Sequence, residues 1–138
     1  YIITKKLSAH LGHQGRIINL SSAAQSPVDL DALIGKTLLD DNSAYAQSKL
    51  ALTMWSHQLG TFNQEKETNG PTIIAVNPKS FLGSKMVKEA YGIAGGDIKE
   101  GADILIKLTL SNKFEAASGK YFDSMHKKTR HLFEQWMT

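Results

Sequence analysis

The run Thr72–Val76 constrains the fold of this chain most strongly, because it is a continuous stretch of β-branched and apolar residues. Strands of parallel sheets, which are covered on both faces, have this composition. The preceding Asn69-Gly70-Pro71 is a turn signal. A second buried strand is predicted at Ile17–Leu20, after a turn at Gly15-Arg16. Two such strands separated by helical sequence indicate an α/β fold with a parallel sheet.

Helical spacing of apolar residues predicts the surrounding elements. Residues 1–14 have this spacing, and the glycines at 12 and 15 provide a stop signal. A long helix is predicted from about Ser43 to Lys66, and a short one that Asp29 caps. Asp97 is expected to cap a further helix, with Glu100 completing a capping box. The apolar side predicted for that helix comprises Ile98, Ala102, Leu105, Ile106 and Leu110.

The long helix places Tyr45 and Lys49 four residues apart, so both side chains lie on one face. A nearby cation favours the ionised form of a phenol, which makes such a hydroxyl a usable proton donor and acceptor near neutral pH. An exposed helix face is the simpler interpretation of this spacing taken alone. Similarly, Ser21-Ser22 at the end of the first strand alone would indicate a turn or a helix cap.

The order of these segments resembles the short-chain dehydrogenase/reductase family. The strand with its serine pair at Gly15–Ala23 comes first, then Tyr45 and Lys49, then the strand that ends in Asn77-Pro78. The resemblance extends from about residue 1 to residue 123, and the longer loop before Tyr45 is similar to the retinol-dehydrogenase-like branch. It implies a doubly wound, Rossmann-like parallel sheet.

Ser118–Phe122 resembles the last strand of that family. The resemblance therefore implies that the strands at Ile17, Ile73 and Tyr121 are neighbours in the sheet. It also implies self-association into a homo-oligomer, because the helix that carries the Tyr-x-x-x-Lys pair forms part of a dimer interface in the family.

The activity implied by the resemblance is NAD(P)-dependent oxidoreduction, with hydride moving between the nicotinamide and a small-molecule carbonyl or alcohol. The cofactor would be NAD or NADP. Tyr45 would exchange a proton with the substrate oxygen, and Lys49 would assist it and hold the nicotinamide ribose. Ser22 would orient the substrate oxygen and steady its developing charge.

The segment Asn77–Met86 corresponds to the part of the family that passes over the nicotinamide. Pro78 and Ser84 are expected to contact the cofactor, with Ser84 standing about one residue later than the family's threonine. Lys79 replaces a glycine of the family pattern. Phe81 and Leu82 would offer apolar surface to the substrate, and packing within the loop is the alternative role.

No Gly-rich turn follows a strand in this sequence to cradle a pyrophosphate. We therefore expect residues 1–138 to form one domain, the catalytic carboxyl-terminal half of such an enzyme, with the dinucleotide-binding half missing. Its absence would bare the edge of the Ile17 strand and favour oligomerisation or aggregation. The alternative function is an inactive fragment that serves only as an oligomerising or interaction module. A Ser22 hydrolase is discounted because the Gly-x-Ser-x-Gly elbow is absent.

Composition narrows the remaining classes of function, site and partner. The chain is 41% apolar and 21% charged, as in ordinary globular proteins. It has no Cys, which excludes disulfides and thiolate metal sites and suits a cytoplasmic location. The net charge of +3 is spread along the chain, so no nucleic-acid partner is expected. No metal site is expected from the spacing of the histidines and loop aspartates. No membrane span is expected, and the tail from Lys127 is expected to be a short basic helix.

Overall fold

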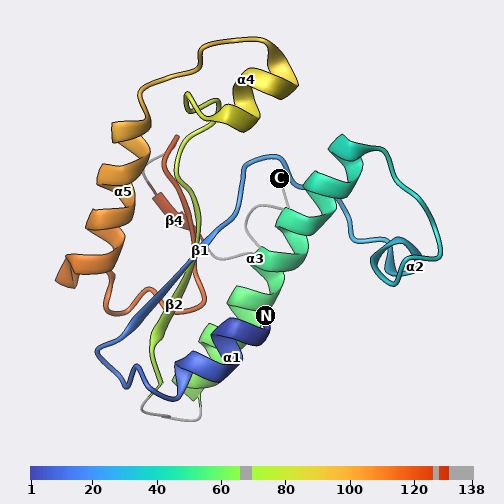
Figure 1. Cartoon of the computed structure of the whole chain (residues 1–138). Coiled ribbons are helices and arrows are strands. Elements are labelled where there is room, and N and C mark those ends of the chain that lie inside the picture. Colours follow the sequence, from blue (N-terminus) through green and yellow to red (C-terminus); the bar gives the residue numbers. More distant parts are fainter. Residues whose placement is uncertain (66–69, 126–127, 131–138) are drawn as a thin grey trace.

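The computed structural model describes residues 1–65 and 70–125 and the backbone of residues 128–130. A four-stranded sheet of β1 (Arg16–Leu20), β2 (Thr72–Asn77), β3 (Tyr121–Asp123) and β4 (Lys128–Arg130) lies at the centre, in that spatial order (Figure 1). β1, β2 and β3 run parallel, and β4 pairs antiparallel with β3. The predicted α/β fold and its three neighbouring parallel strands are confirmed.

The β4 strand corrects part of the prediction for the tail. Residues 128–130 extend the sheet instead of starting a basic helix. Residues 126–127 and 131–138, where the rest of that helix was predicted, lie outside the described residues.

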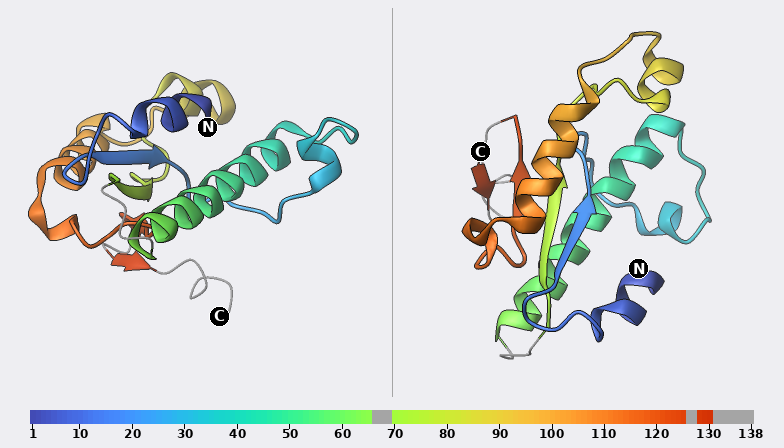
Figure 2. Two further views of the ribbon diagram at one scale, coloured as in Figure 1. Left: turned by 90° about the horizontal axis from the view of Figure 1, so that it is seen from below. Right: turned by 60° about the vertical axis from the view of Figure 1, so that its left-hand side comes forward.

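Two helices cover opposite faces of the sheet, α3 (Asp41–Glu65) and α5 (Ile98–Leu110) (Figure 2). Alternate residues of β2 point to the two faces. On the α3 side, Asn19 of β1 donates a hydrogen bond of 2.8 Å to Ser56 of the helix. The apolar core on the α5 side consists of Ile74, Val76, Leu108, Phe114, Ala117 and Phe122.

The α5 helix buries only part of the predicted apolar side: Leu105 packs against the core as expected, and Ile104, which was not predicted, packs there too. Gly101 and Leu108 are its buried residues, whereas Ile98, Ile106 and Leu110 are exposed. A Cβ atom on Gly101 would lie 2.5 Å from Leu82 Cδ1. The glycine therefore lets α5 lie close to the Leu82 side chain of the loop after β2.

The α3 helix lies close to the turn before β3 at Gly60. A Cβ atom on Gly60 would lie 2.2 Å from the Gly119 nitrogen, and Gly119 has a φ of +76°. Ser118 fixes the same contact, because its hydroxyl donates to the Gly60 carbonyl (3.2 Å) and accepts from the Ile73 amide (3.1 Å). These contacts anchor the carboxyl half of α3 against the sheet.

The strand β1 forms a free edge in the described part of the chain, because its hydrogen-bonded neighbour there is β2 alone. It is half-buried, and its last residue is exposed, so the predicted full burial is wrong.

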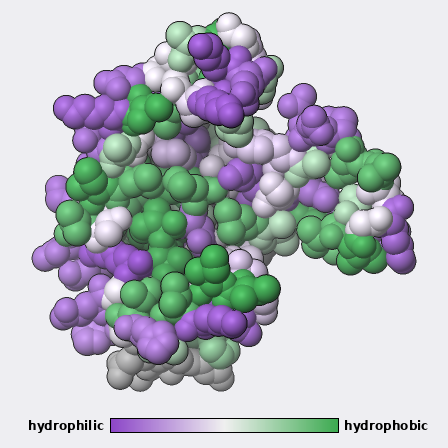
Figure 3. Space-filling view, in the orientation of Figure 1, coloured by the Kyte–Doolittle hydropathy of each residue, from purple (hydrophilic) through white to green (hydrophobic). Residues whose placement is uncertain are grey.

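The helix α1 (Ile2–Ser8) is shorter than the predicted 1–14 helix and has no buried residue. Figure 3 shows apolar surface gathered over α1, along β1 and over α2 (Leu30–Leu33). Its exposed residues include Ile2, Ile3, Leu7, Leu20, Leu30 and Leu33.

The remaining elements are short. The Asp29 carboxylate caps α2 by accepting from the amides of Asp31 and Ala32, as predicted. A seven-residue helix, α4 (Lys85–Tyr91), follows β2 and was not predicted. A 3₁₀ turn at Asn112–Phe114 leads towards β3. Within residues 1–65 and 70–125, no helix has the length and apolar character needed to cross a membrane.

Candidate active site

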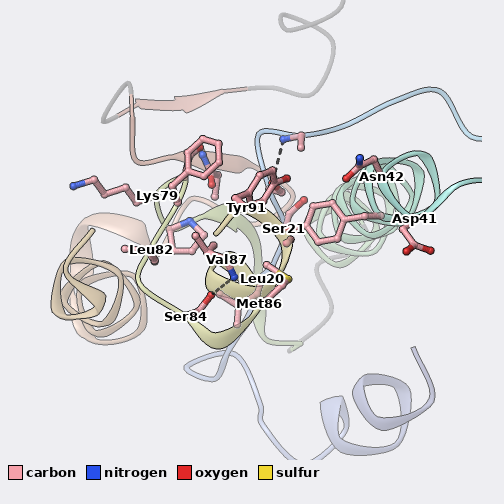
Figure 4. Close-up of a pocket in the computed structure, with 18 residues that line it drawn as sticks. Leu20, Ser21, Asp41, Asn42, Lys79, Leu82, Ser84, Met86, Val87 and Tyr91 are labelled. Carbon is pink, nitrogen blue, oxygen red and sulfur yellow. Dashed lines mark hydrogen bonds between the residues drawn. The ribbon is translucent and has the colours of Figure 1, made fainter. Parts of the chain in front are cut away.

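A cavity of about 590 Å³ opens at the carboxyl ends of β1 and β2 (Figure 4). Ligand sites of open parallel sheets form at this edge. Its walls come from the chain after β1, the first turn of α3, the chain after β2, and α4. Of the predicted site residues, those that line it are Ser22, Tyr45, Pro78, Phe81, Leu82 and Ser84. Lys49, the remaining predicted site residue, is not among the lining residues, but it contacts Leu20 and Tyr45, which are.

Tyr45 and Lys49 lie together on the first turns of α3. The Lys49 Nζ atom is 5.3 Å from the centroid of the Tyr45 ring, and an ammonium over an aromatic face is attracted to it. Lys49 Nζ also donates a hydrogen bond of 2.9 Å to the carbonyl of Leu20, the last residue of β1. The lysine therefore ties α3 to the end of the strand that precedes the serine pair.

The two serines after β1 have different environments. Ser21 is buried, and its hydroxyl contacts Thr53 Oγ1 (2.6 Å) and donates to the Lys49 carbonyl (3.0 Å). Ser22 is half-buried and accepts a hydrogen bond of 3.1 Å from the Ala24 amide. A hydroxyl that accepts one hydrogen bond keeps its own proton for another partner. Ser21 thus packs the strand against α3, whereas the Ser22 hydroxyl can donate into the cavity.

The first turn of α3 is fixed by Asp40, immediately before the helix. Its carboxylate accepts from the hydroxyl of Ser43 (2.6 Å) and from the amides of Asn42 and Ser43 (3.0 Å each). These hydrogen bonds, that of the Ser43 hydroxyl first, hold the pKa of Asp40 below its usual value of 3.8. The cap sets where the helix begins, and therefore where Tyr45 lies.

The chain after β2 turns at Lys79, the residue that stands where the resembled family has glycine. Its φ is 153°, a backbone conformation that favours glycine. Figure 4 shows the lysine pointing away from the cavity, and its Nζ donates to Glu100 of α5 (2.5 Å). The predicted capping box is therefore only half formed: the Asp97 side chain accepts from the Lys99 amide (2.9 Å), while the Glu100 side chain bonds Lys79.

The loop and helix between β2 and α5 form one wall of the cavity. Ser84 caps α4 by accepting from the Val87 amide (3.3 Å), so this predicted cofactor residue also has a local structural role. The rings of Phe81 and Tyr91 pack edge to face, with centroids 5.2 Å apart. Phe81 therefore packs within the loop and also lines the cavity, and its contact with a substrate stays a prediction.

The glycine-rich segment 92–96 packs against the loop that follows β2 and completes this wall. The Gly83 amide donates to the Gly96 carbonyl, and the Gly96 amide donates to the Phe81 carbonyl, both at 2.7 Å. A Cβ atom on Gly95 would lie 2.7 Å from the Gly83 backbone, so these two backbone segments can touch only because both residues are glycines. The contact and the two hydrogen bonds hold the ends of the loop together.

Several cavity residues were missed from the sequence. Asp41 and Asn42 line the cavity, and they precede Tyr45 by four and three residues, so helical spacing could have found them. Tyr91 lines it from α4, a helix whose seven residues are too few for a clear periodic signal.

Acidic and histidine side chains do not gather into a metal site in the described residues. His57 illustrates the role of a histidine in packing. Its Nδ1 atom lies 2.8 Å from the carbonyl of Gly119, at the close approach between α3 and the turn before β3. This contact adds to the anchoring of the carboxyl half of α3.

Two curated relatives are similar to the chain over most of its length. They are the short-chain dehydrogenases TIC 32 A and TIC 32 B of Brassica napus, both named chloroplastic. Each is 30% identical over 132 residues, which cover 86% of this chain and 41% of the relative. This similarity supports the short-chain dehydrogenase family. The chain spans less than half the length of these short-chain dehydrogenases, and no family model matches it. A finer placement in the retinol-dehydrogenase-like branch stays a prediction.

Proposed function

We propose that the chain carries the Ser22–Tyr45–Lys49 site of an NAD(P)-dependent oxidoreductase. The observation that carries the proposal is the shared cavity of Ser22 and Tyr45, with the Lys49 ammonium 5.3 Å from the Tyr45 ring. Similarity to short-chain dehydrogenases supports the reaction class. The reaction would move hydride between a nicotinamide and a carbonyl or alcohol.

The residues of the cavity fit one end of the cofactor. Pro78 and Ser84 line the same wall, and the Ser84 hydroxyl, which accepts from Val87, keeps its proton to donate to a carboxamide oxygen. Lys49 would hold the nicotinamide ribose. The sequence has no Gly-rich turn after a strand. In this proposal, residues 1–138 are therefore the catalytic half, and the segment that binds the pyrophosphate of the cofactor is not among them. When bound, NAD(P) supplies or accepts the hydride.

Ser22, Tyr45 and Lys49 would each have a different role in the reaction at the substrate oxygen. In carbonyl reduction, Ser22 donates a hydrogen bond to that oxygen and Tyr45 gives it a proton. Alcohol oxidation runs the same transfers in reverse. The Lys49 ammonium stabilises the negative charge left on the phenol oxygen. Phe81 and Leu82 would hold the apolar body of the substrate.

Replacing the phenol tests the proposal. In the full-length native protein, Tyr45→Phe should lower kcat for reduction of decanal by NADH or NADPH by at least about a hundredfold, because it removes the proton donor. The dissociation constant of the reduced cofactor should stay nearly unchanged. The matched control is Tyr1→Phe, whose ring packs on Trp55 outside the cavity, and it should leave both quantities unaltered. Full turnover in Tyr45→Phe would remove that residue from the mechanism.

An interaction module without turnover is the second candidate function. This alternative would use the exposed apolar surface of α1 and the edge of β1 that is unpaired in the described part of the chain. Titration of the full-length protein with NADH and NADPH, followed by nicotinamide fluorescence, discriminates between the two. Binding supports the oxidoreductase, whereas no binding of either cofactor supports the module.

The proposal extends to partners and location. The substrate would be a mostly apolar carbonyl or alcohol, because apolar residues from the loop after β2 and from α4 line the cavity. A homo-oligomer would pack through α3. The cytoplasmic location stays a prediction, and the two relatives are named chloroplastic.

A further inference from the structure

The backbone carbonyl of Ser22 accepts hydrogen bonds from two side chains far apart in the sequence. The Tyr121 hydroxyl donates to it at 3.0 Å, and the Gln25 Nε2 atom donates at 2.8 Å. A carbonyl with two lone pairs is thereby satisfied from two directions. The peptide that follows Ser22 is fixed, and with it the direction in which the Ser22 side chain leaves the backbone.

Tyr121 reaches Ser22 across the sheet. It begins β3, is 2% exposed, and pairs in register with Ala75 of β2, which in turn pairs with Asn19 of β1. The residue between β1 and β3 in this row is thus an alanine, whose single methyl group leaves room above β2. The phenol bridges from β3 to the chain that follows β1.

Gln25 connects the same carbonyl to the helix. Its Nε2 atom lies 3.4 Å from Thr53 Oγ1, and the Thr53 hydroxyl donates to the Lys49 carbonyl at 2.8 Å. The Ser22 carbonyl is therefore tied to β3 by Tyr121, and through Gln25 and Thr53 to the helical turn that carries Lys49. One polar network thus links β3, the chain after β1, and α3.

We infer that Tyr121 is a positioning residue for Ser22, which it holds through the Ser22 carbonyl so that the Ser22 hydroxyl faces the cavity. The inference rests on the proposed function for its catalytic consequence. Tyr121 is not among the residues that line the cavity, and it acts through the backbone of Ser22. A small displacement of an oriented group is costly to a reaction that depends on alignment.

The first test measures position and needs no activity. Tyr121→Phe keeps the buried ring and removes the hydroxyl. It should shift the backbone amide NMR signals of Ala23, whose nitrogen shares the peptide with the Ser22 carbonyl, and of Ala24, whose amide donates to Ser22 Oγ. The control is Ser118→Ala, which removes another buried hydroxyl and should instead shift the signal of Ile73, its hydrogen-bond donor. Unshifted Ala23 and Ala24 signals in Tyr121→Phe would overturn the inference.

The second test measures the catalytic consequence. With decanal and reduced cofactor, Tyr121→Phe should lower kcat of the full-length protein roughly tenfold with KM for the cofactor unchanged. If the phenol acts through Ser22, the double variant Ser22→Ala/Tyr121→Phe should be no slower than Ser22→Ala alone. Additive losses would overturn the inference, because they would mean that Tyr121 acts independently of Ser22.

The outcomes separate this inference from the proposed function. Full turnover in Tyr45→Phe, or none in the native protein, would overturn the proposed function and with it the catalytic role of Tyr121. An active native protein with unshifted Ala23 and Ala24 signals in Tyr121→Phe would overturn the inference alone. Should Tyr121→Phe fail to fold, Gln25→Met removes the other donor to the same carbonyl and should shift the same signals.

Discussion

Lys79 holds a backbone conformation that suits glycine better than lysine. Its φ of 153° brings the lysine Cβ close to the neighbouring peptide oxygen, a cost of about 1–3 kcal/mol at such positions. The residue is held by the end of β2 on one side and by its contact with Glu100 on the other. An exposed ion pair contributes little by itself, so the fold and not the charge fixes this turn.

This strain predicts an inverted order of stability at position 79. Lys79→Gly and Lys79→Ala both lose the Glu100 contact, but only glycine relieves the backbone. We expect Lys79→Gly to be more stable than Lys79→Ala by roughly 1 kcal/mol, opposite to the usual cost of glycine. Urea unfolding of the two variants measures the difference. Equal stabilities, or a more stable alanine variant, would show that the turn carries no strain.

At the same scale, sequence reasoning could identify residues but not their orientations. The motif order selected Ser22, Tyr45 and Lys49, and the spacing of Tyr45 and Lys49 on a helix explains why those two lie together. Nothing in the sequence could reveal that the Tyr121 hydroxyl reaches the Ser22 carbonyl, because that contact depends on which strands are neighbours and on a small residue between them.

Elements were predictable where a pattern has one interpretation. The continuous apolar run at Thr72–Val76 is a buried central strand, because few other environments tolerate such a run. The α5 helix was harder, because its apolar side is wider than the part that packs: Leu105 and Leu108 contact the core, whereas Ile106 and Leu110 are exposed. Which part of that side is buried depends on the elements that the helix meets, which is a tertiary feature.

The amino-terminal cap of α3 predicts a pH-dependent stability. The pKa of Asp40 is lowered in the folded protein by the Ser43 hydroxyl and by backbone amides. The ionised carboxylate therefore stabilises the fold above the unfolded value near 3.8, and this contribution is lost as the pH falls through the folded pKa. We expect Asp40→Ala to lower Tm at neutral pH and to match the unsubstituted protein at more acid pH.

The matched control for this cap is Asp40→Asn. An asparagine caps helices about as well as aspartate but does not titrate, so this variant should keep most of the neutral-pH Tm and lose the pH dependence. Thermal unfolding followed by circular dichroism between pH 2 and pH 7, values chosen to bracket an aspartate pKa of about 4, measures both effects. A pH-independent loss in Asp40→Ala would mean that the carboxylate charge is not what stabilises the first turn.

For the whole molecule, one edge of the sheet, the edge that β1 forms, has no neighbouring strand in the described residues. Exposed apolar residues of α1 lie on the same face of the molecule as β1 (Figure 3). The relatives are more than twice as long as the matched region. The sequence alone predicted an unpaired strand edge and favoured oligomerisation, but it could not identify the chain or segment that covers this surface.

This unpaired edge predicts self-association of the 138-residue chain. An unpaired strand edge beside apolar surface is a template for pairing with another copy, so sedimentation velocity should find oligomers instead of a single monomer peak.

Leu20→Lys places a charge at the exposed end of β1 and should raise the monomer fraction, because lysine on an edge opposes pairing. Ile34→Lys is the control, since Ile34 is also apolar and exposed but directly follows α2 and is not part of the β1 edge. A monodisperse monomer at all concentrations would contradict the prediction. Dissociation by Ile34→Lys but not by Leu20→Lys would place the contact on the α2 segment instead.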